Sequence, residues 1–541
     1  MTYNLQKWQR VAILLVILVI GFLLRTFNLD FPSIGYHNMK ENEYLSMAQE
    51  MNRSGDYTSR KIYFYFSFDK DPRVKWYPQV PLVSYQTVLA WKALGENLWA
   101  PRLVNVVFGL FSILTMYLIA QLLFKNAIVS LFASLMMALM PLAIFFSRNL
   151  QPESPGFFFM LLGTLFYLRF AATVKKQNLL WAGLAFSIAW TYKFSFIFGM
   201  LPVLFYLPYT RLFSNRKDLI RMIIVFTAGF ALALGVYLWL QWLGQWEFEK
   251  SETFNRIKIF AIFHPSYWKQ YGKMISWYVC NENFTWVYTI LTAVGIIRAF
   301  FYRRGLLDRF IIGWSCTLII YCMIFSDHIN QHNYYQMPFL ALVCVASVYA
   351  VLWGRDVLQK FFKRDFTVIL LSVVIAGSAP FVADATVRMY SSIFPGCDVA
   401  GESLKEFTKP NDRVFLYTYP QGVGIARYAR RFMDKPASFA DFKKFEQEYD
   451  IRYACFYPAE FVFTLQKNDP ALFTYIQSTY HVKEVGLTGE PNKVTYIILE
   501  RGKGSDPKNF LQSFSGKFQL RTIYRVLGRY VFFYTLRPPV E

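Results

Sequence analysis

Long apolar runs alternate with short polar segments from the start of the chain to about residue 384. The hydrocarbon core of a bilayer is about 30 Å thick, so a helix needs about 20 apolar residues to cross it. This pattern predicts an α-helical polytopic membrane domain. About eleven segments reach or approach the required length: residues 11–27, 100–124, 127–147, 155–173, 178–192, 194–209, 219–243, 285–302, 309–326, 336–354 and 366–384.

The orientation of these segments is predicted by the basic residues, because short cytoplasmic loops are enriched in Lys and Arg. With the N-terminus in the cytoplasm, every basic cluster falls on the cytoplasmic side. The clusters are Lys125; Lys175 and Lys176; Arg211, Arg216, Lys217 and Arg221; Arg298, Arg303, Arg304 and Arg309; and Arg355, Lys360, Lys363 and Arg364. The first apolar run lacks a small-residue cleavage site, which predicts a retained signal anchor.

This orientation places three polar stretches outside the cytoplasm, namely residues 28–98, 244–284 and 385–541. The last has short runs of aromatic and β-branched residues, which are typical of strands. They are Arg413–Tyr419, Ile451–Tyr457, Lys493–Glu500 and Arg529–Leu536, and helical-looking stretches such as 438–449 separate them. We therefore expect a transmembrane domain over 1–384 and an α/β soluble extracytoplasmic domain over 385–541.

Composition supports a membrane protein, because 55% of the residues are hydrophobic and only 17% are charged. The net charge of +22 is spread over short clusters between apolar runs, which argues against a nucleic-acid partner. Cys397 and Cys455 share the C-terminal region, where they form either a disulfide or two buried thiols. No cysteine and histidine spacing indicates a zinc site.

The first outside loop begins with a predicted helix over Asn38–Met51, in which Tyr44, Met47, Ala48 and Met51 recur at helical spacing. Glu41 lies at the border of this apolar face. An interfacial helix of this kind holds a carboxylate at the membrane surface. The alternative is a helix whose acidic residues face water.

Two short outside loops carry ionisable residues close to the bilayer. Arg148 and Glu153 lie in the loop before the fourth apolar segment, and Lys193 lies between two short segments. Charges at this depth are costly and tend to be functional. The alternatives are a carboxylate favoured by a helix N-terminus and a lysine that reaches toward the interface.

A fourth candidate, Asp327–Pro338, lies at another outer membrane end and contains His332, Tyr334, Tyr335 and Gln336. An aromatic interfacial belt would account for its tyrosines, but less well for its histidine and glutamine. All four candidate regions are expected on the same outer side of the membrane.

Residues 10–355 resemble bacterial GT-C membrane glycosyltransferases, above all the group of protein O-mannosyltransferases and lipid A aminoarabinose transferases. The resemblance rests on the order and placement of several motifs. These are Ala48–Met51, Gly55-Asp56, Tyr77–Leu82, Gly95-Glu96, Arg102–Asn105, Arg148–Glu153, Lys193 and His332–Pro338.

This resemblance implies a catalytic acid in the helix after the first span, which relatives open with an acidic pair followed by Tyr. The matching positions read Lys40-Glu41 with Tyr44 after them, so Glu41 is the first choice for the base and Glu43 the second. Glu153 matches the second acid of the family. Relatives often have a glutamate before the second span, whereas this chain reads Lys75–Pro78 without it. If relatives hold a metal with that glutamate, this chain does not hold one there, and a divalent cation elsewhere stays an open possibility.

The implied reaction moves a sugar, with inversion, from a polyprenyl-phosphate donor to a hydroxyl of a lipid, glycan or protein acceptor. A carboxylate acts as general base, and cations stabilise the departing phosphate. The substrate-binding candidates are Tyr44, Arg102, Arg148, Lys193, His332, Tyr334, Tyr335 and Gln336. An en bloc oligosaccharide transferase or ligase and a transporter or flippase are the alternative functions. The expected location is the inner (plasma) membrane.

Overall fold

The computed structural model describes residues 5–58, 62–64, 80–173, 175–207, 209, 216–243, 258–302, 305–419, 421–489, 492–502 and 518–537. The motif segment 75–79 and residues 244–257 of the second outside stretch lie outside these ranges. The chain forms two compact units. A helical unit comprises Met1–Asp30, Pro78–Gln86 and Ala90–Arg388, and a sheet unit comprises Phe31–Tyr77, Thr87–Leu89 and Met389–Glu541.

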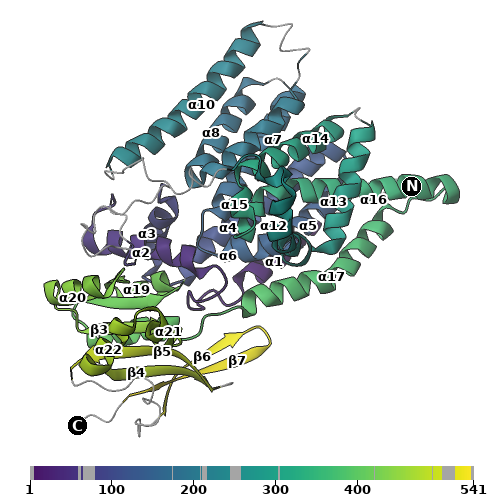
Figure 1. The fold of residues 1–541 in the computed structure, drawn as a ribbon. Coiled ribbons are helices and arrows are strands. Elements are labelled where there is room, and N and C mark those ends of the chain that lie inside the picture. Colours follow the sequence, from purple (N-terminus) through teal and green to yellow (C-terminus); the bar gives the residue numbers. More distant parts are fainter. Residues whose placement is uncertain are drawn as a thin grey trace. The chain divides into compact units, whose positions relative to one another are not determined.

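The helical unit consists of helices throughout its described residues (Figure 1). In chain order they are α1 (Lys7–Thr26), α3 (Leu82–Leu94), α4 (Trp99–Phe124), α5 (Ala127–Leu139), α6 (Pro141–Arg148), α7 (Glu153–Thr173), α8 (Lys176–Tyr192), η2 (Phe194–Phe205), α10 (Arg216–Leu243), η4 (Ala261–Phe263), α12 (Pro265–Trp277), η5 (Tyr278–Asn283), α13 (Thr285–Tyr302), α14 (Leu306–Ile324), α15 (Ser326–Ile329), η6 (Asn333–Phe339), α16 (Leu340–Phe362) and α17 (Thr367–Ser391).

Seven helices among the described residues are long and apolar enough to cross a membrane, and the pair α5 and α6, bent by 58°, makes an eighth if it is one span. The polytopic helical class predicted from the sequence is therefore confirmed. Every predicted segment overlaps a helix. The segments 178–192, 194–209 and 219–243 overlap α8, η2 and α10, and the count of eleven spans stays a prediction.

Close packing in the helical unit depends on small residues. A Cβ atom at Gly295 of α13 would lie 2.1 Å from the main-chain oxygen of Ala346 in α16, so only glycine permits this approach. In a bilayer, helices gain little from burying apolar surface against one another, because lipid is equally apolar. Close contact between small residues therefore contributes much of their association.

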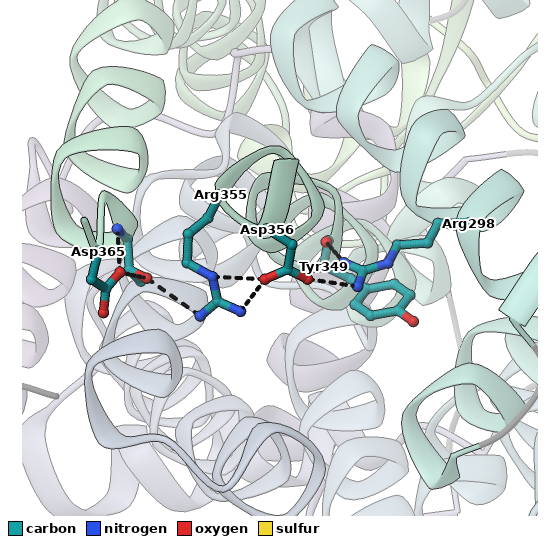
Figure 2. Close-up of polar contacts among 6 residues, drawn as sticks. Arg298, Tyr349, Arg355, Asp356 and Asp365 are labelled. Atoms are coloured by element: carbon teal, nitrogen blue, oxygen red, sulfur yellow. Dashed lines mark hydrogen bonds and ion pairs between the residues drawn. The ribbon is translucent and has the colours of Figure 1, made fainter. Parts of the chain in front are cut away.

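A chain of polar contacts joins the ends of α13, α16 and α17 (Figure 2). Arg298 donates to Asp356 at 3.0 Å, Arg355 donates to the same carboxylate at 2.5 Å, and Arg355 also reaches Thr367 at 3.4 Å. Asp356 thus lies between two guanidinium groups. Arg298 and Arg355 come from two of the basic clusters that predict the cytoplasmic side.

The sheet unit is a mixed α/β structure. It contains α2 (Asn38–Ser54), α18 (Cys397–Phe407), α19 (Gly422–Ala429), α20 (Phe439–Glu448), α21 (Phe461–Asn468) and α22 (Pro470–Thr479). Its strands are β1 (Arg413–Thr418), β2 (Phe432–Asp434), β3 (Tyr453–Tyr457), β4 (Tyr480–Gly489), β5 (Asn492–Arg501), β6 (Phe518–Val526) and β7 (Arg529–Leu536). They form one sheet in the order β2-β1-β3-β5-β4-β7-β6 (Figure 1).

The four predicted strands correspond to β1, β3, β5 and β7, and the stretch 438–449 forms α20, so the α/β class is confirmed. The prediction missed β2, β4 and β6. β2 has only three residues, while β4 carries charged and glycine residues among its apolar ones. Cross-strand pairing, which local sequence does not report, decides such segments.

Cys397 and Cys455 are both buried and free. Of the two alternatives left by the sequence, the structure therefore has the pair of buried thiols. Burial raises the pKa of each thiol, which keeps both groups protonated.

Candidate functional site

The helical unit holds a buried ion pair between Glu153 and Lys193. The lysine Nζ lies 2.6 Å from Oε1 of the carboxylate, and the side chains are 2% and 4% exposed. Glu153 is in the first turn of α7, where the positive end of the helix dipole favours an anion. Lys193 follows α8 with an extended backbone, which directs the chain into η2. The sequence placed both residues in outer loops, and the fold brings them into contact.

Two tyrosine rings from η6 face the lysine of this pair. Nζ of Lys193 lies 3.8 Å from the ring centroid of Tyr335 and 4.7 Å from that of Tyr334. Both distances fall within the range of cation–π contacts. His332, just before η6, stacks on Tyr334 with ring centroids 5.1 Å apart. Three predicted substrate-binding residues thus join the ion pair in one cluster.

One oxygen of the Glu153 carboxylate has no hydrogen-bond partner within the described part of the chain. Oε1 receives the lysine, whereas Oε2 is buried without a donor. Buried polar atoms are nearly always hydrogen-bonded, and an unsatisfied one calls for a reason. An incoming hydroxyl group could donate to this oxygen without disturbing the ion pair.

The loop that carries Glu153 is held by a buried asparagine. The amide nitrogen of Asn105 in α4 donates to the main-chain oxygens of Asn149 at 2.5 Å and Gln151 at 3.1 Å. Its amide oxygen accepts from Gln86 at 2.7 Å. These contacts fix the start of α7. Asn105 had no role predicted from the sequence beyond its place in a motif, although an amide in an apolar segment is itself a signal.

The two predicted arginines bind main-chain oxygens. Arg148 donates to the carbonyl of Asn28 and Arg102 to that of Leu29, both at 2.7 Å. The two guanidinium groups therefore hold the segment that follows α1. Arg25, which the sequence analysis left without a role, is fully buried and donates to Ala138 at 2.9 Å. A role for Arg148 or Arg102 in binding phosphate stays a prediction.

Gln336 lies at the junction of η6 with η5, a single-turn π-helix. Its side-chain oxygen accepts from Asn283 at 2.9 Å, and Asn283 also exchanges contacts with Asn333. π-helical turns often mark functional sites. Gln336 is thus buried and held by a residue of η5.

The acidic helix of the first loop, α2, belongs to the sheet unit. Glu41 and Glu43 are 3% and 6% exposed, so the alternative in which they face water does not hold. Glu41 accepts a hydrogen bond from the hydroxyl of Ser33 at 2.6 Å. Glu43 instead pairs with Lys40 at 2.8 Å, and Tyr44 is buried. The lysine that replaces the expected acid thus pairs with Glu43.

Within the described ranges, no cluster of three or more His, Cys, Asp or Glu residues is arranged to hold a metal ion. Residues 65–79 lie outside these ranges and include Asp69 and Asp71. The contact of Glu153 is the ammonium group of Lys193, and a cationic neighbour does not suit a divalent cation.

Residues 78–242 match the family model described as dolichyl-phosphate-mannose-protein mannosyltransferase. The undecaprenyl phosphate-alpha-4-amino-4-deoxy-L-arabinose arabinosyl transferase of Pseudomonas paraeruginosa is 30% identical over 174 residues. That match covers 31% of this chain and 30% of the relative. The chain therefore spans only about three tenths of the length of this relative.

Two solved structures resemble almost the whole chain. ArnT from Cupriavidus metallidurans has a TM-score of 0.51 at 15% identity, with 90% of this chain and 97% of that chain covered. The oligosaccharyltransferase AglB from Archaeoglobus fulgidus has a TM-score of 0.54 at 11% identity, with 96% and 80% covered. At these identities the likeness shows a shared fold. In its matched segment and in its fold, this chain is therefore similar to GT-C membrane glycosyltransferases.

Proposed function

We propose that this protein transfers a single sugar from a polyprenyl-phosphate donor to an acceptor hydroxyl on the outer side of the membrane, with inversion. The relative that matches part of this chain is named for a donor of this class. ArnT from Cupriavidus metallidurans has also been solved bound to undecaprenyl phosphate, and that structure resembles this chain with a TM-score of 0.50. A lipid-linked donor also fits a reaction that takes place in a membrane protein.

The observation that carries the proposal is the buried cluster of Glu153, Lys193 and the two tyrosines Tyr334 and Tyr335. An ammonium group in an apolar unit suits a lipid phosphate, because a fixed cation stabilises the charge that builds on the leaving group. The open oxygen of Glu153 suits a hydroxyl of the sugar or of the acceptor. Such a site has no evident use in a purely structural bundle, where a buried ion pair adds little stability.

In the proposed reaction the acceptor oxygen attacks the anomeric carbon. The bond between that carbon and the phosphate oxygen breaks, and the lipid phosphate leaves with the bonding electrons. The hydroxyl proton passes to a carboxylate. Glu41 is the proposed base and Glu43 the second choice, since Lys40 already neutralises Glu43.

The remaining predicted residues take binding roles in this proposal. Lys193 and Arg148 stabilise the phosphate, and His332 supplies a further hydrogen bond. The other proposed substrate-binding residues are Tyr44, Arg102, Tyr334, Tyr335 and Gln336. The proposed placement is a multi-pass protein of the inner membrane with its N-terminus in the cytoplasm, a transmembrane domain over residues 1–384, and residues 385–541 outside the cytoplasm.

The proposal is tested with membranes that contain the full chain and a labelled polyprenyl-phosphate sugar. Glu41→Gln and Glu153→Gln are each expected to lower transfer by at least about 100-fold, the lower range for loss of a general base. Glu402→Gln is the matched control, because its carboxylate is 49% exposed on α18. Near-normal transfer by both test variants would show that the site is wrong.

The alternative functions give different results in the same system. Turnover of a nucleotide sugar without a lipid carrier would overturn the donor class. Transfer from a diphosphate-linked oligosaccharide but not from the monosaccharide donor would indicate en bloc transfer. The oligosaccharyltransferase AglB resembles this chain in fold. Movement of the labelled lipid across the membrane without transfer would indicate a flippase. Mass spectrometry of surface glycans and glycolipids from a deletion strain would identify the acceptor.

A further inference from the structure

Within the sheet unit, α2 packs directly against α19, which lies almost 400 residues later in the chain. The contact is polar as well as apolar. Nε of Arg427 in α19 donates to the amide oxygen of Asn42 at 2.6 Å. The amide nitrogen of Asn42 then donates to the main-chain oxygens of Ser33 at 2.8 Å and Asn38 at 2.9 Å. Both partners of the first bond are buried.

A second line of contacts runs through Ser33, which lies in the segment before α2. The main-chain N–H of Ser33 donates to the hydroxyl of Tyr428 at 2.8 Å. The hydroxyl of Ser33 donates to Oε2 of Glu41 at 2.6 Å. The amide of Asn38 donates to Gln421, just before α19, at 2.7 Å. Two residues of α19 therefore hold Ser33: Tyr428 directly, and Arg427 through Asn42 of α2. Ser33 in turn donates to the carboxylate of Glu41.

Side chains of α2 and α18 also lie close to the backbone of α19 at this contact. A Cβ atom added at Gly424 of α19 would lie 2.8 Å from Sγ of Cys397 and 3.1 Å from the amide nitrogen of Asn42. Glycine at this position lets α19 approach both α2 and α18. The charged groups around the contact are Lys40 and Glu43 on α2, Arg427 on α19 and Asp398 on α18.

We propose that Ser33, Asn42 and Arg427 are positioning residues, through which the C-terminal part of the chain fixes the carboxylate of Glu41 for catalysis. This inference rests on the proposed function, in which Glu41 is the base. It assigns the C-terminal part of the chain a role in catalysis in addition to any contact with the acceptor. The sequence placed Glu41 in a loop of the membrane domain, whereas its partner Ser33 is bonded to Tyr428 directly and is linked to Arg427 through Asn42.

A positioning role has a kinetic consequence that a purely structural role lacks. A misplacement of about 1 Å in a catalytic group lowers the rate by as much as about 100-fold. The donor KM need not change, because the positioning residues do not touch the donor in this proposal. Loss of the Ser33 hydroxyl also removes a hydrogen bond that favours the charged form of Glu41, so the pKa of this carboxylate rises.

The test compares Ser33→Ala and Arg427→Met with Arg427→Lys and the parent chain, all full length and in membranes. Ser33→Ala is expected to lower kcat by about 10- to 100-fold at constant donor KM. It is also expected to move the acidic limb of the pH–rate profile up by about one unit, because a base must be deprotonated to act. Arg427→Met is expected to lower kcat, and Arg427→Lys to restore part of it.

Ser438→Ala is the matched control, because its hydroxyl caps α20 in the same unit and contacts Asp441. It should leave the pH–rate profile unchanged. An unchanged profile and kcat in Ser33→Ala, or a lower kcat with no movement of the acidic limb, would overturn the inference. If Glu41→Gln itself keeps full transfer, the proposed function is wrong in its choice of base. This failure is distinguishable from a failure of the positioning inference, because it is measured without any change at Ser33 or Arg427.

Discussion

Replacement of Lys193 by methionine tests the buried cluster directly. The variant keeps most of the side-chain volume and removes the positive charge, so Glu153 stays behind as a buried anion that is 2% exposed. Breaking a buried ion pair by removal of one partner costs about 3–5 kcal/mol, because the other charge is left without compensation. The contacts of the ammonium with the rings of Tyr335 and Tyr334 are lost as well.

The structure also supplies a partial compensation. Glu153 occupies the first turn of α7, where the helix dipole stabilises an anion by up to about 2 kcal/mol in a partly buried setting. We therefore expect Lys193→Met to lower the free energy of unfolding by about 2–4 kcal/mol. The double variant Lys193→Met with Glu153→Gln leaves no buried charge, and it should be less destabilised than the single variant.

The assay combines equilibrium unfolding of the full chain in detergent with transfer activity in membranes. The four members of the cycle should give a coupling free energy of at least about 2 kcal/mol between the two side chains. The double variant should regain stability but not transfer, because the cation for the phosphate is missing. Additive losses in the double variant would refute the ion pair, and full transfer by Lys193→Met would refute its role in catalysis.

Two further predictions concern the regions outside the cluster. Asp356→Asn should destabilise the helical unit by about 1–3 kcal/mol, measured by equilibrium unfolding, because Arg298 then loses its charged partner; an unchanged stability would contradict the network in Figure 2. For Glu500, burial alone would raise the carboxyl pKa, but Lys483 and Tyr453 outweigh it and the pKa is lowered. A lowered pKa contributes stability that is present above the ordinary carboxyl value of about 4.3 and is lost as the pH falls through the folded-state pKa. The midpoint temperature of thermal unfolding should therefore fall less steeply from neutral to acidic pH in Glu500→Gln than in the parent. Parallel plots of this temperature against pH would contradict the prediction.

Much of the fold follows from local sequence. The runs that predict the membrane helices are long and apolar, and lipid requires each of them to satisfy its own backbone hydrogen bonds. The strands β1, β3, β5 and β7 are dense in aromatic and β-branched residues and were predicted for that reason. The short strand β2 and the mixed strand β4 depend on their neighbours in the sheet, so the local pattern did not reveal them.

The candidate site divides in the same way. Sequence alone located Glu41, Glu153, Lys193 and the tyrosines of 327–338, because charge and hydrogen-bonding capacity at membrane ends are conspicuous against an apolar background. It did not reveal that Glu153 pairs with Lys193, forty residues away, since that distance in space depends on how α7, α8 and η2 pack. It also could not separate Glu41 from Glu43, because the contact of Glu41 with Ser33 and that of Glu43 with Lys40 appear only in the fold.

The sequence by itself therefore determined the class of protein, the approximate positions of its helices and the residue types of its site. Hydrophobic length and charge are properties of short segments, and a bilayer imposes its requirement on each segment separately. Only the tertiary structure decided which polar groups meet. The α2 helix is the clearest case: its sequence predicts an amphipathic helix beside the membrane, but Asn42 and Arg427 are 385 residues apart, and only the packing of α2 on α19 joins them.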